Sequence, residues 1–269
     1  MKIALCLHGY FANAGGIEAS VKGAAYIKKN IIKDKLVDVF VHSWEQDESI
    51  QQKIKKTYNP AKCSFELQKE FNEETSKINI NDFDEGFDRS QTMYKSNSPF
   101  QALSFLYSRQ QSLKLKKEHE VKNNFVYDCV VLARFDLGQR GKECQQRYYA
   151  TDINFDETLD MNYLYSFYWD QLNYGYGDHW FYSNSENMDI VGDAFNKVVD
   201  YYQINSKYAQ SVTTGWPHSN AEDEFSNERL RESPTKKLVK FPKWHCIDNH
   251  KFYKWYFIDT DLYDKSKFV

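Results

Sequence analysis

An arginine and an aspartate, two positions apart, follow the most apolar segment of the chain. Arg134 and Asp136 come directly after residues 126–133, which read Val-Tyr-Asp-Cys-Val-Val-Leu-Ala. In an extended chain, residues i and i+2 point to the same side, so the two side chains are expected to face the same way. The pair predicts either a structural salt bridge or a phosphate site. In such a site Asp136 would coordinate a divalent cation and Arg134 would pair with phosphate oxygens.

Two other predicted strands, residues 3–7 and 37–41, also end in residues that could contact a nucleotide. These residues are Gly9, Tyr10, His42, Ser43 and Trp44. In open α/β sheets, ligands bind outside the carboxyl ends of the strands. A small residue there lets a ligand approach the backbone, and Tyr10 or Trp44 could stack on a base. The alternative is a plain transition from strand to loop. Neither GxGxxG nor a P-loop signature is present, so the pattern indicates neither NAD(P) nor a P-loop nucleotide.

Acidic residues in the second half are candidates for a general base, which must reach the hydroxyl that it deprotonates. Asp178 follows Gly177 at the mouth of a predicted strand, where it could equally cap a turn. Glu222 and Asp223 lie in an acidic run that could bind an acceptor or supply the base. Such runs are also typical of helix starts, where negative charge is favourable. No GxSxG motif or Cys–His setting indicates a nucleophilic enzyme.

Aromatic residues are unusually frequent: 20 Tyr, 19 Phe and 6 Trp among 269 residues. They concentrate in residues 148–182 and 241–257. Aliphatic residues are scarce, so part of this excess must fill the core, where a buried tyrosine hydroxyl needs a partner. Another part could stack on sugars, and the first candidates are Tyr174, Tyr176 and Trp180. In the second cluster, a late histidine such as His245 or His250 could complete a metal site with Asp136 or simply pack.

The order of apolar runs and helical periodicities predicts an α/β protein. Continuous apolar runs are typical of parallel strands that are covered on both faces. The predicted strands are residues 3–7, 37–41, 61–67, 126–133, 179–183 and 238–241. The predicted helices are residues 17–32, 47–57, 98–121 and 186–203, and residues 72–95 are expected to be a surface loop. No linker is visible, so we expect one domain, with a nucleotide-binding half (1–137) and an acceptor-side half (138–269).

Composition excludes several classes of protein. The net charge of −3 argues against a protein that binds nucleic acid through phosphate contacts. The chain contains no run of about 18 apolar residues, so no transmembrane helix is predicted. Only a peripheral association with a membrane stays open. The five cysteines are scattered without a CxxC motif, which argues against structural zinc and favours a reducing compartment such as the cytoplasm.

Three of these segments together resemble a group of small glycosyltransferases with a GT-A-like fold. Such enzymes occur in bacterial surface-polysaccharide clusters and in large DNA viruses. The similar segments are Lys2-Ile-Ala-Leu-Cys-Leu-His-Gly, Asp38-Val-Phe-Val-His-Ser-Trp and Tyr127-Asp-Cys-Val-Val-Leu-Ala-Arg-Phe-Asp-Leu, with a weaker likeness in residues 177–184. The resemblance implies a mostly parallel, Rossmann-type sheet flanked by helices, with an irregular, aromatic-rich C-terminal lobe.

The resemblance also implies an activity and a role for each candidate. Arg134-x-Asp136 resembles a variant of the DxD motif, in which Asp136 would hold Mn²⁺ or Mg²⁺ on a nucleotide-sugar diphosphate. Arg134 would assist, and the residues at the first two strand ends would line the nucleotide. The expected reaction transfers a sugar to a hydroxyl of a glycan acceptor, in the cytoplasm of a bacterium or of a virus-infected host cell. Two alternatives stay open: a non-catalytic carbohydrate-binding protein, and a nucleotidyl- or phospho-group transferase.

Overall fold

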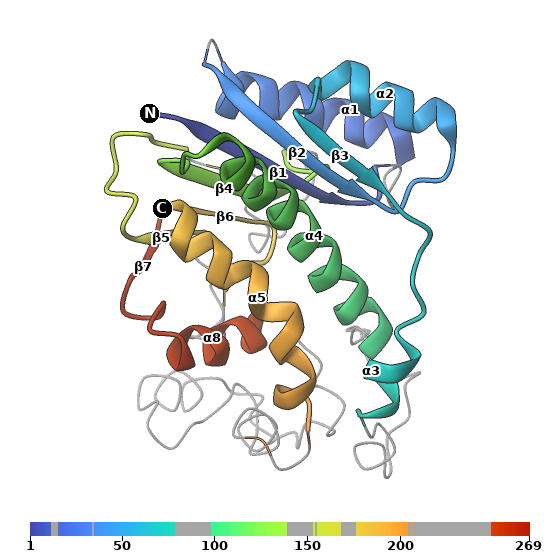
Figure 1. The fold of residues 1–269 in the computed structure, drawn as a ribbon, viewed down its shortest axis with the longest axis vertical. Coiled ribbons are helices and arrows are strands. Elements are labelled where there is room, and N and C mark those ends of the chain that lie inside the picture. The colour runs from blue at the N-terminus through green and yellow to red at the C-terminus, as the bar shows by residue number, and fades with distance from the viewer. Residues whose placement is uncertain are drawn as a thin grey trace, which may run out of the picture.

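A computed structural model describes residues 1–11, 16–33, 35–78, 98–138, 153, 155–167, 176–203, 206 and 249–269. One seven-stranded sheet runs through it in the order β3-β2-β1-β4-β6-β5-β7 (Figure 1). The strands are β1 (Ile3–Gly9), β2 (Val37–Ser43), β3 (Lys62–Phe65), β4 (Cys129–Arg134), β5 (Leu164–Ser166), β6 (Trp180–Ser183) and β7 (Ser266–Phe268). The helices are α1 (Gly16–Ile27) with a π-helical turn η1 (Lys28–Ile32), α2 (Glu48–Tyr58), α3 (Asn72–Ser76), α4 (Pro99–Asn123), α5 (Ser185–Tyr201) and α8 (Asn249–Asp259).

The sheet is mixed, and the expectation of a mostly parallel sheet is wrong. Strand β1 pairs in parallel with β2 and β4, and β2 with β3. Strand β6 runs antiparallel to both of its neighbours, β4 and β5, whereas β5 and β7 are parallel. The reason is that β6 is as continuously buried as β1 and β4. A continuous apolar run indicates that both faces of a strand are covered, but it carries no information on direction.

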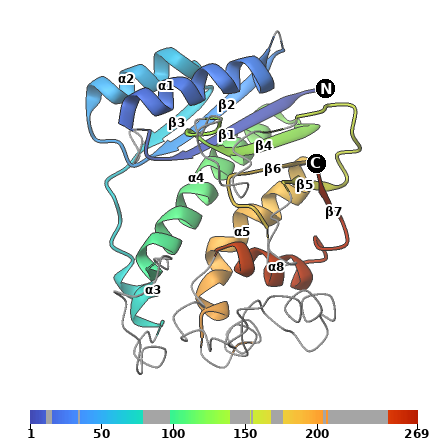
Figure 2. The same ribbon diagram turned by 180° about the vertical axis from the view of Figure 1, so that it is seen from behind.

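The helices form layers on the two faces of the sheet, as the two opposite views show (Figures 1 and 2). Alternate residues of β1 belong to different cores because successive side chains of a strand point to opposite faces. Ala4 and Cys6 pack in one core with residues of α4, α5 and α8. Ile3, Leu5 and Leu7 pack in the other core with residues of α1 and α2. The alternation therefore also decides which strand-end side chains face α4.

Helix α4 is the element that carries polar residues into the molecule. It begins at Ser98 with a capping box, in which Ser98 and Gln101 each satisfy the other's backbone N–H, and Pro99 follows. It ends at Asn124 in the left-handed conformation. Its buried side includes Ser108, Arg109, Ser112, Lys116 and Glu120 besides apolar residues. Burial of so many polar groups on one helix requires partners on the elements that it covers.

Most expected elements of the described ranges are confirmed to within a few residues. The helix expected at 98–121 is α4, and the strand expected at 179–183 is β6. Helix α3 lies inside the segment expected to be a loop. The strand expected at 238–241 lies outside the described residues. In the described part of the chain, no helix is both long and apolar enough to cross a membrane.

Candidate functional site

The strand order reverses between β1 and β4. From β1 the chain proceeds outward to β2 and β3, and β4 then lies on the other side of β1. Ligands of open α/β sheets bind in the crevice outside the carboxyl ends of the strands at such a point. There His8 is the register partner of Arg134. Gly9 has a φ of +96°, which favours glycine, and its N–H donates to Ser108 Oγ at 2.9 Å.

Arg109 of α4 brings a buried positive charge to this point. Its side chain is 1% exposed. Its Nε donates to His8 Nε2 at 3.2 Å, its Nη1 donates to Tyr253 OH at 2.9 Å, and its guanidinium lies 4.1 Å from the centre of the Phe105 ring. No described carboxylate lies within ion-pair distance of it, and its Nη2 has no hydrogen-bond partner among the described residues. Asp178 is a described carboxylate whose charge acts on Arg109, but it lies beyond ion-pair distance. The buried guanidinium thus keeps an unsatisfied donor at Nη2, and this arrangement favours binding of an anionic ligand.

His8 is held in one neutral form beside this arginine. Burial, followed by the charges of Arg109 and Arg134, holds its pKa well below the ordinary value. Because a guanidinium N–H can only donate, Nε2 of the neutral ring is the acceptor and Nδ1 carries the proton. Within the described ranges, this Nδ1 has no hydrogen-bond partner. The carboxyl end of β1 therefore offers buried donors on both His8 and Arg109.

Arg134 and Asp136 form a bidentate salt bridge. This is one of the two interpretations that their spacing allows. Arg134 Nε donates to Asp136 Oδ1 at 2.7 Å, and Nη2 donates to Oδ2. Burial acts to lower the pKa of Arg134, but the charges of Asp136 and Asp178 outweigh this effect and raise it. The guanidinium thus stays charged, and 26% of its side chain is exposed.

The described residues do not fit a divalent metal site centred on Asp136. Both oxygens of its carboxylate accept hydrogen bonds from Arg134. Nowhere in the described ranges does a group of three or more His, Cys, Asp or Glu side chains gather in a way that could hold a metal ion. His250 approaches Asp178 rather than Asp136, and His245 lies outside the described residues.

Asp178 is buried among positively charged or ionisable groups. Its Oδ1 lies 3.9 Å from His179 Nδ1 and 4.0 Å from His250 Nε2. Burial alone would raise its pKa, but the neighbouring charges of His250, Arg109 and Arg134 lower it well below the usual range. A carboxylate that holds a proton so weakly is a poor general base and a good counterion. The role of proton acceptor for Asp178 stays a prediction that this environment does not favour.

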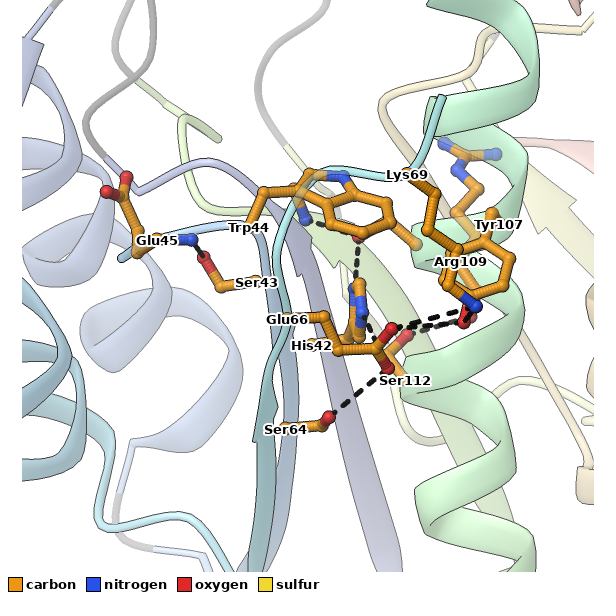
Figure 3. A network of polar contacts seen from close by, with 12 residues as sticks. His42, Ser43, Trp44, Glu45, Ser64, Glu66, Lys69, Tyr107, Arg109 and Ser112 are labelled. Carbon is orange, nitrogen blue, oxygen red and sulfur yellow. Dashed lines mark hydrogen bonds and ion pairs between the residues drawn. The ribbon is translucent and has the colours of Figure 1, made fainter. Parts of the chain in front are cut away.

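A second polar cluster lies beside the end of β2 (Figure 3). Ser108 Oγ accepts from the N–H of Gly9 and shares a second hydrogen bond of 2.7 Å with His42 Nδ1. His42 Nε2 lies 3.5 Å from Glu66 Oε1. Burial lowers the pKa of His42 to about 4, so this ring is neutral near pH 7. These contacts fix the backbone at the ends of β1 and β2 relative to α4.

The aromatic residues at these strand ends differ in accessibility. Trp44 is 2% exposed and stacks on Tyr107, with ring centres 5.4 Å apart. Tyr107 donates to Glu66 Oε2 at 3.1 Å and accepts from Lys69 Nζ (Figure 3). Tyr10, by contrast, is 42% exposed directly after Gly9. Of these two expected base-stacking residues, Tyr10 is the one with an accessible ring.

The residues expected to bind the acceptor are buried or lie outside the described part of the chain. Trp180 is fully buried and stacks on Tyr182, with ring centres 5.6 Å apart. Tyr176 is 3% exposed and packs edge-on against Phe257. Neither ring presents an open face to a sugar. Tyr174, Glu222 and Asp223 lie outside the described residues. The roles expected of these five residues therefore stay predictions.

Sequence reasoning missed Arg109, although the helix carries a signal that could have found it. The buried positions of α4 repeat at intervals of three and four, and Arg109 occupies one of them. This stripe consists of Ala102, Leu106, Arg109, Leu113, Lys116 and Glu120. A charged residue on the apolar stripe of a helix is buried with a partner or in a site.

A surface hollow of about 350 Å³ lies elsewhere, next to the residues that precede β4. The residues around it are Val126, Tyr127, Asp128, Asp160, Met161, Asn162, Asn184, Ser185 and Glu186. It contains three carboxylates and no basic side chain, so it does not suit an anionic ligand.

Comparison of the chain with known proteins finds no match among family models, curated proteins or solved structures.

Proposed function

We propose that this chain is a GT-A-like glycosyltransferase that moves a sugar from a nucleoside diphosphate sugar to a hydroxyl of a glycan acceptor. The observation that carries the proposal is Arg109, a buried cation at the point where the strand order reverses, with an unsatisfied Nη2 and no described carboxylate within ion-pair distance. A diphosphate would accept hydrogen bonds from the unsatisfied Nη2 of Arg109 and add a directly bound negative charge. Arg134 on the adjacent strand end adds a second, partly exposed guanidinium. The resemblance of the strand segments to glycosyltransferases supports the choice of substrate.

The proposed reaction needs stabilisation of the leaving group above all. The bond between the anomeric carbon and the diphosphate oxygen breaks, and its electron pair stays on that oxygen. The acceptor oxygen forms the new bond to the anomeric carbon and gives its proton to a base. Fixed positive charges stabilise the developing charge on the diphosphate, which is the role of Arg134 and Arg109. Gly9 allows the donor to approach the backbone closely, and the ring of Tyr10 can stack on the base of the nucleotide.

We place this reaction in the cytoplasm. The described cysteines, Cys6, Cys63 and Cys129, are free thiols, which supports a reducing compartment. The second function that the site favours is nucleotidyl or phospho-group transfer, because it would use the same anion site. A non-catalytic carbohydrate-binding role draws no support from Tyr176 and Trp180, since both rings are buried.

Thermal stabilisation by nucleotide sugars tests the proposal. A ligand present at 100 times its Kd stabilises the folded state by about 2.7 kcal/mol. For a chain of this size we expect at least one nucleotide sugar to raise Tm by roughly 5–10 °C. The Arg109→Met variant should lose this shift. Lys114→Ala, a change of an exposed residue on the same helix, should keep it.

Product analysis with a nucleotide sugar labelled in the sugar and in the phosphate separates the alternatives. Transfer of the sugar label alone to a glycan supports the proposal. Transfer of the phosphate label would indicate a phospho-group transferase. Stabilisation by free sugars but by no nucleotide would contradict both and indicate a carbohydrate-binding protein.

A further inference from the structure

We infer that the site holds the donor diphosphate without a divalent metal ion, with Arg134 as the cation on the diphosphate and Asp136 as the residue that positions it. This inference rests on the proposed function and goes beyond it, because the resemblance implies Mn²⁺ or Mg²⁺ at Asp136. The geometry points the other way, since the carboxylate and the guanidinium already satisfy each other through two hydrogen bonds.

The salt bridge orients Arg134 without using all of its donors. A guanidinium has five N–H donors, and Asp136 takes one on Nε and one on Nη2. Among the described residues, no hydrogen bond uses Nη1 or the second N–H of Nη2. The fork geometry of a guanidinium matches a phosphate group, and its charge does not depend on pH in the physiological range. Arg134 is also 26% exposed, so a ligand can reach it.

The surrounding charges oppose a divalent cation at this point. Arg109 lies on the adjacent helix with no described carboxylate within ion-pair distance. The charges of Arg109 and Arg134 act with burial to keep His8 unprotonated. The same two positive charges would also act against a divalent cation at Asp136, whose carboxylate oxygens both accept hydrogen bonds from Arg134. Asp178 counterbalances the arginines, and its described neighbours are His179 and His250 rather than Asp136.

The experiment measures binding of inorganic pyrophosphate and of nucleoside diphosphates, in excess EDTA and in excess Mn²⁺. We expect Kd in EDTA to lie within about twofold of Kd in Mn²⁺. Arg134→Gln should weaken binding about 10-fold to 100-fold under both conditions, since it removes charge-assisted hydrogen bonds. Asp136→Asn should weaken binding less, and equally in EDTA and in Mn²⁺, because it loosens the guanidinium without removing it. Lys114→Ala is the matched control, and the unfolding curve of each variant shows whether it is folded.

A direct titration with MnCl₂ alone, followed by electron paramagnetic resonance, adds a readout that needs no nucleotide. Wild type and Asp136→Asn should bind Mn²⁺ equally weakly. The inference is overturned if Mn²⁺ strengthens diphosphate binding by tenfold or more and Asp136→Asn abolishes this gain; the proposed function would then stand. If pyrophosphate binds in EDTA and no nucleotide does, metal-free binding of an anion stands, but the donor assignment and the proposed function fail. If neither ligand binds under any condition, both fail.

Discussion

Two buried cations on helix α4, seven positions apart, have opposite surroundings. Lys116 Nζ donates to Glu120 Oε2 at 3.2 Å, to Ser185 Oγ at 2.7 Å and to Asp189 Oδ1 at 2.5 Å. It is a paired charge that ties α4 to α5. Among the described residues, Arg109 donates hydrogen bonds only to the neutral His8 and to the hydroxyl of Tyr253. We infer that Lys116 stabilises the fold and that Arg109 binds a ligand.

Substitution of each cation by methionine tests this distinction. Lys116→Met leaves Glu120, which is 2% exposed, as an uncompensated buried charge, so it should cost about 3–5 kcal/mol of stability. Arg109→Met removes a buried charge that has no ion-pair partner among the described residues, which offsets the loss of hydrogen bonds to His8 and Tyr253. We expect its cost to stay within about 1 kcal/mol. Urea unfolding of both variants measures the difference. Equal losses of stability would mean that Arg109 is a structural residue.

At the level of elements, α4 depends on its first turn. This helix supplies Ser108 and Arg109 to the ends of β1 and β2, so its placement determines the geometry of the candidate site. Its N-terminus is fixed locally by Ser98 Oγ, which accepts the N–H of Gln101 at 3.2 Å, and by Gln101 Oε1, which accepts the N–H of Ser98 at 2.9 Å. A local cap of this kind contributes to stability independently of any ligand.

The Ser98→Ala variant should therefore lower the free energy of unfolding by about 1 kcal/mol, the usual cost of removing such a cap. Since Ser98 lies three turns from Arg109, ligand affinity should not change. Denaturant unfolding measures the first expectation and calorimetry the second. Lys114→Ala controls for substitution by alanine within the same helix. A cost as small as that of Lys114→Ala would contradict the capping role.

For the whole molecule, the buried histidines link stability to pH. Burial lowers the pKa of His42 and of His179 to about 4, and it also lowers the pKa of His8. In the unfolded chain these side chains take up a proton near pH 6.5. Between about pH 4 and pH 6.5 the unfolded state thus binds more protons than the folded state. Stability is then expected to rise with pH across this window and to fall as the solution is acidified.

We expect the free energy of unfolding to decrease by about 1.4 kcal/mol per pH unit for each such histidine as the pH is lowered from 6 to 4.5. Urea unfolding at several pH values measures this slope. The His42→Gln variant should reduce it by the contribution of one histidine, because glutamine does not titrate. A stability that stays constant between pH 6 and pH 4.5 would contradict the burial of neutral histidines.

Local patterns predicted the elements well. The apolar runs at residues 3–7, 37–41 and 126–133 became adjacent strands of the sheet, and Ser98-Pro99 marked the start of α4. These features depend on residues that are neighbours in the chain, so spacing alone reveals them. The spacing of Arg134 and Asp136 likewise placed them on one side, but it did not decide between a salt bridge and a metal site.

Only the tertiary structure decided strand direction and the composition of the site. The antiparallel course of β6 depends on how the chain returns to the sheet, which its apolar run does not encode. Arg109 contacts His8, which is 101 positions away in the sequence, and Tyr253, which is 144 positions away. These contacts form because α4 and α8 pack against the sheet, so no local sequence pattern predicts them. The sequence by itself determined the α/β elements and the Arg134–Asp136 pair, whereas long-range packing decided that Arg109 is buried near this pair with no ion-pair partner among the described residues.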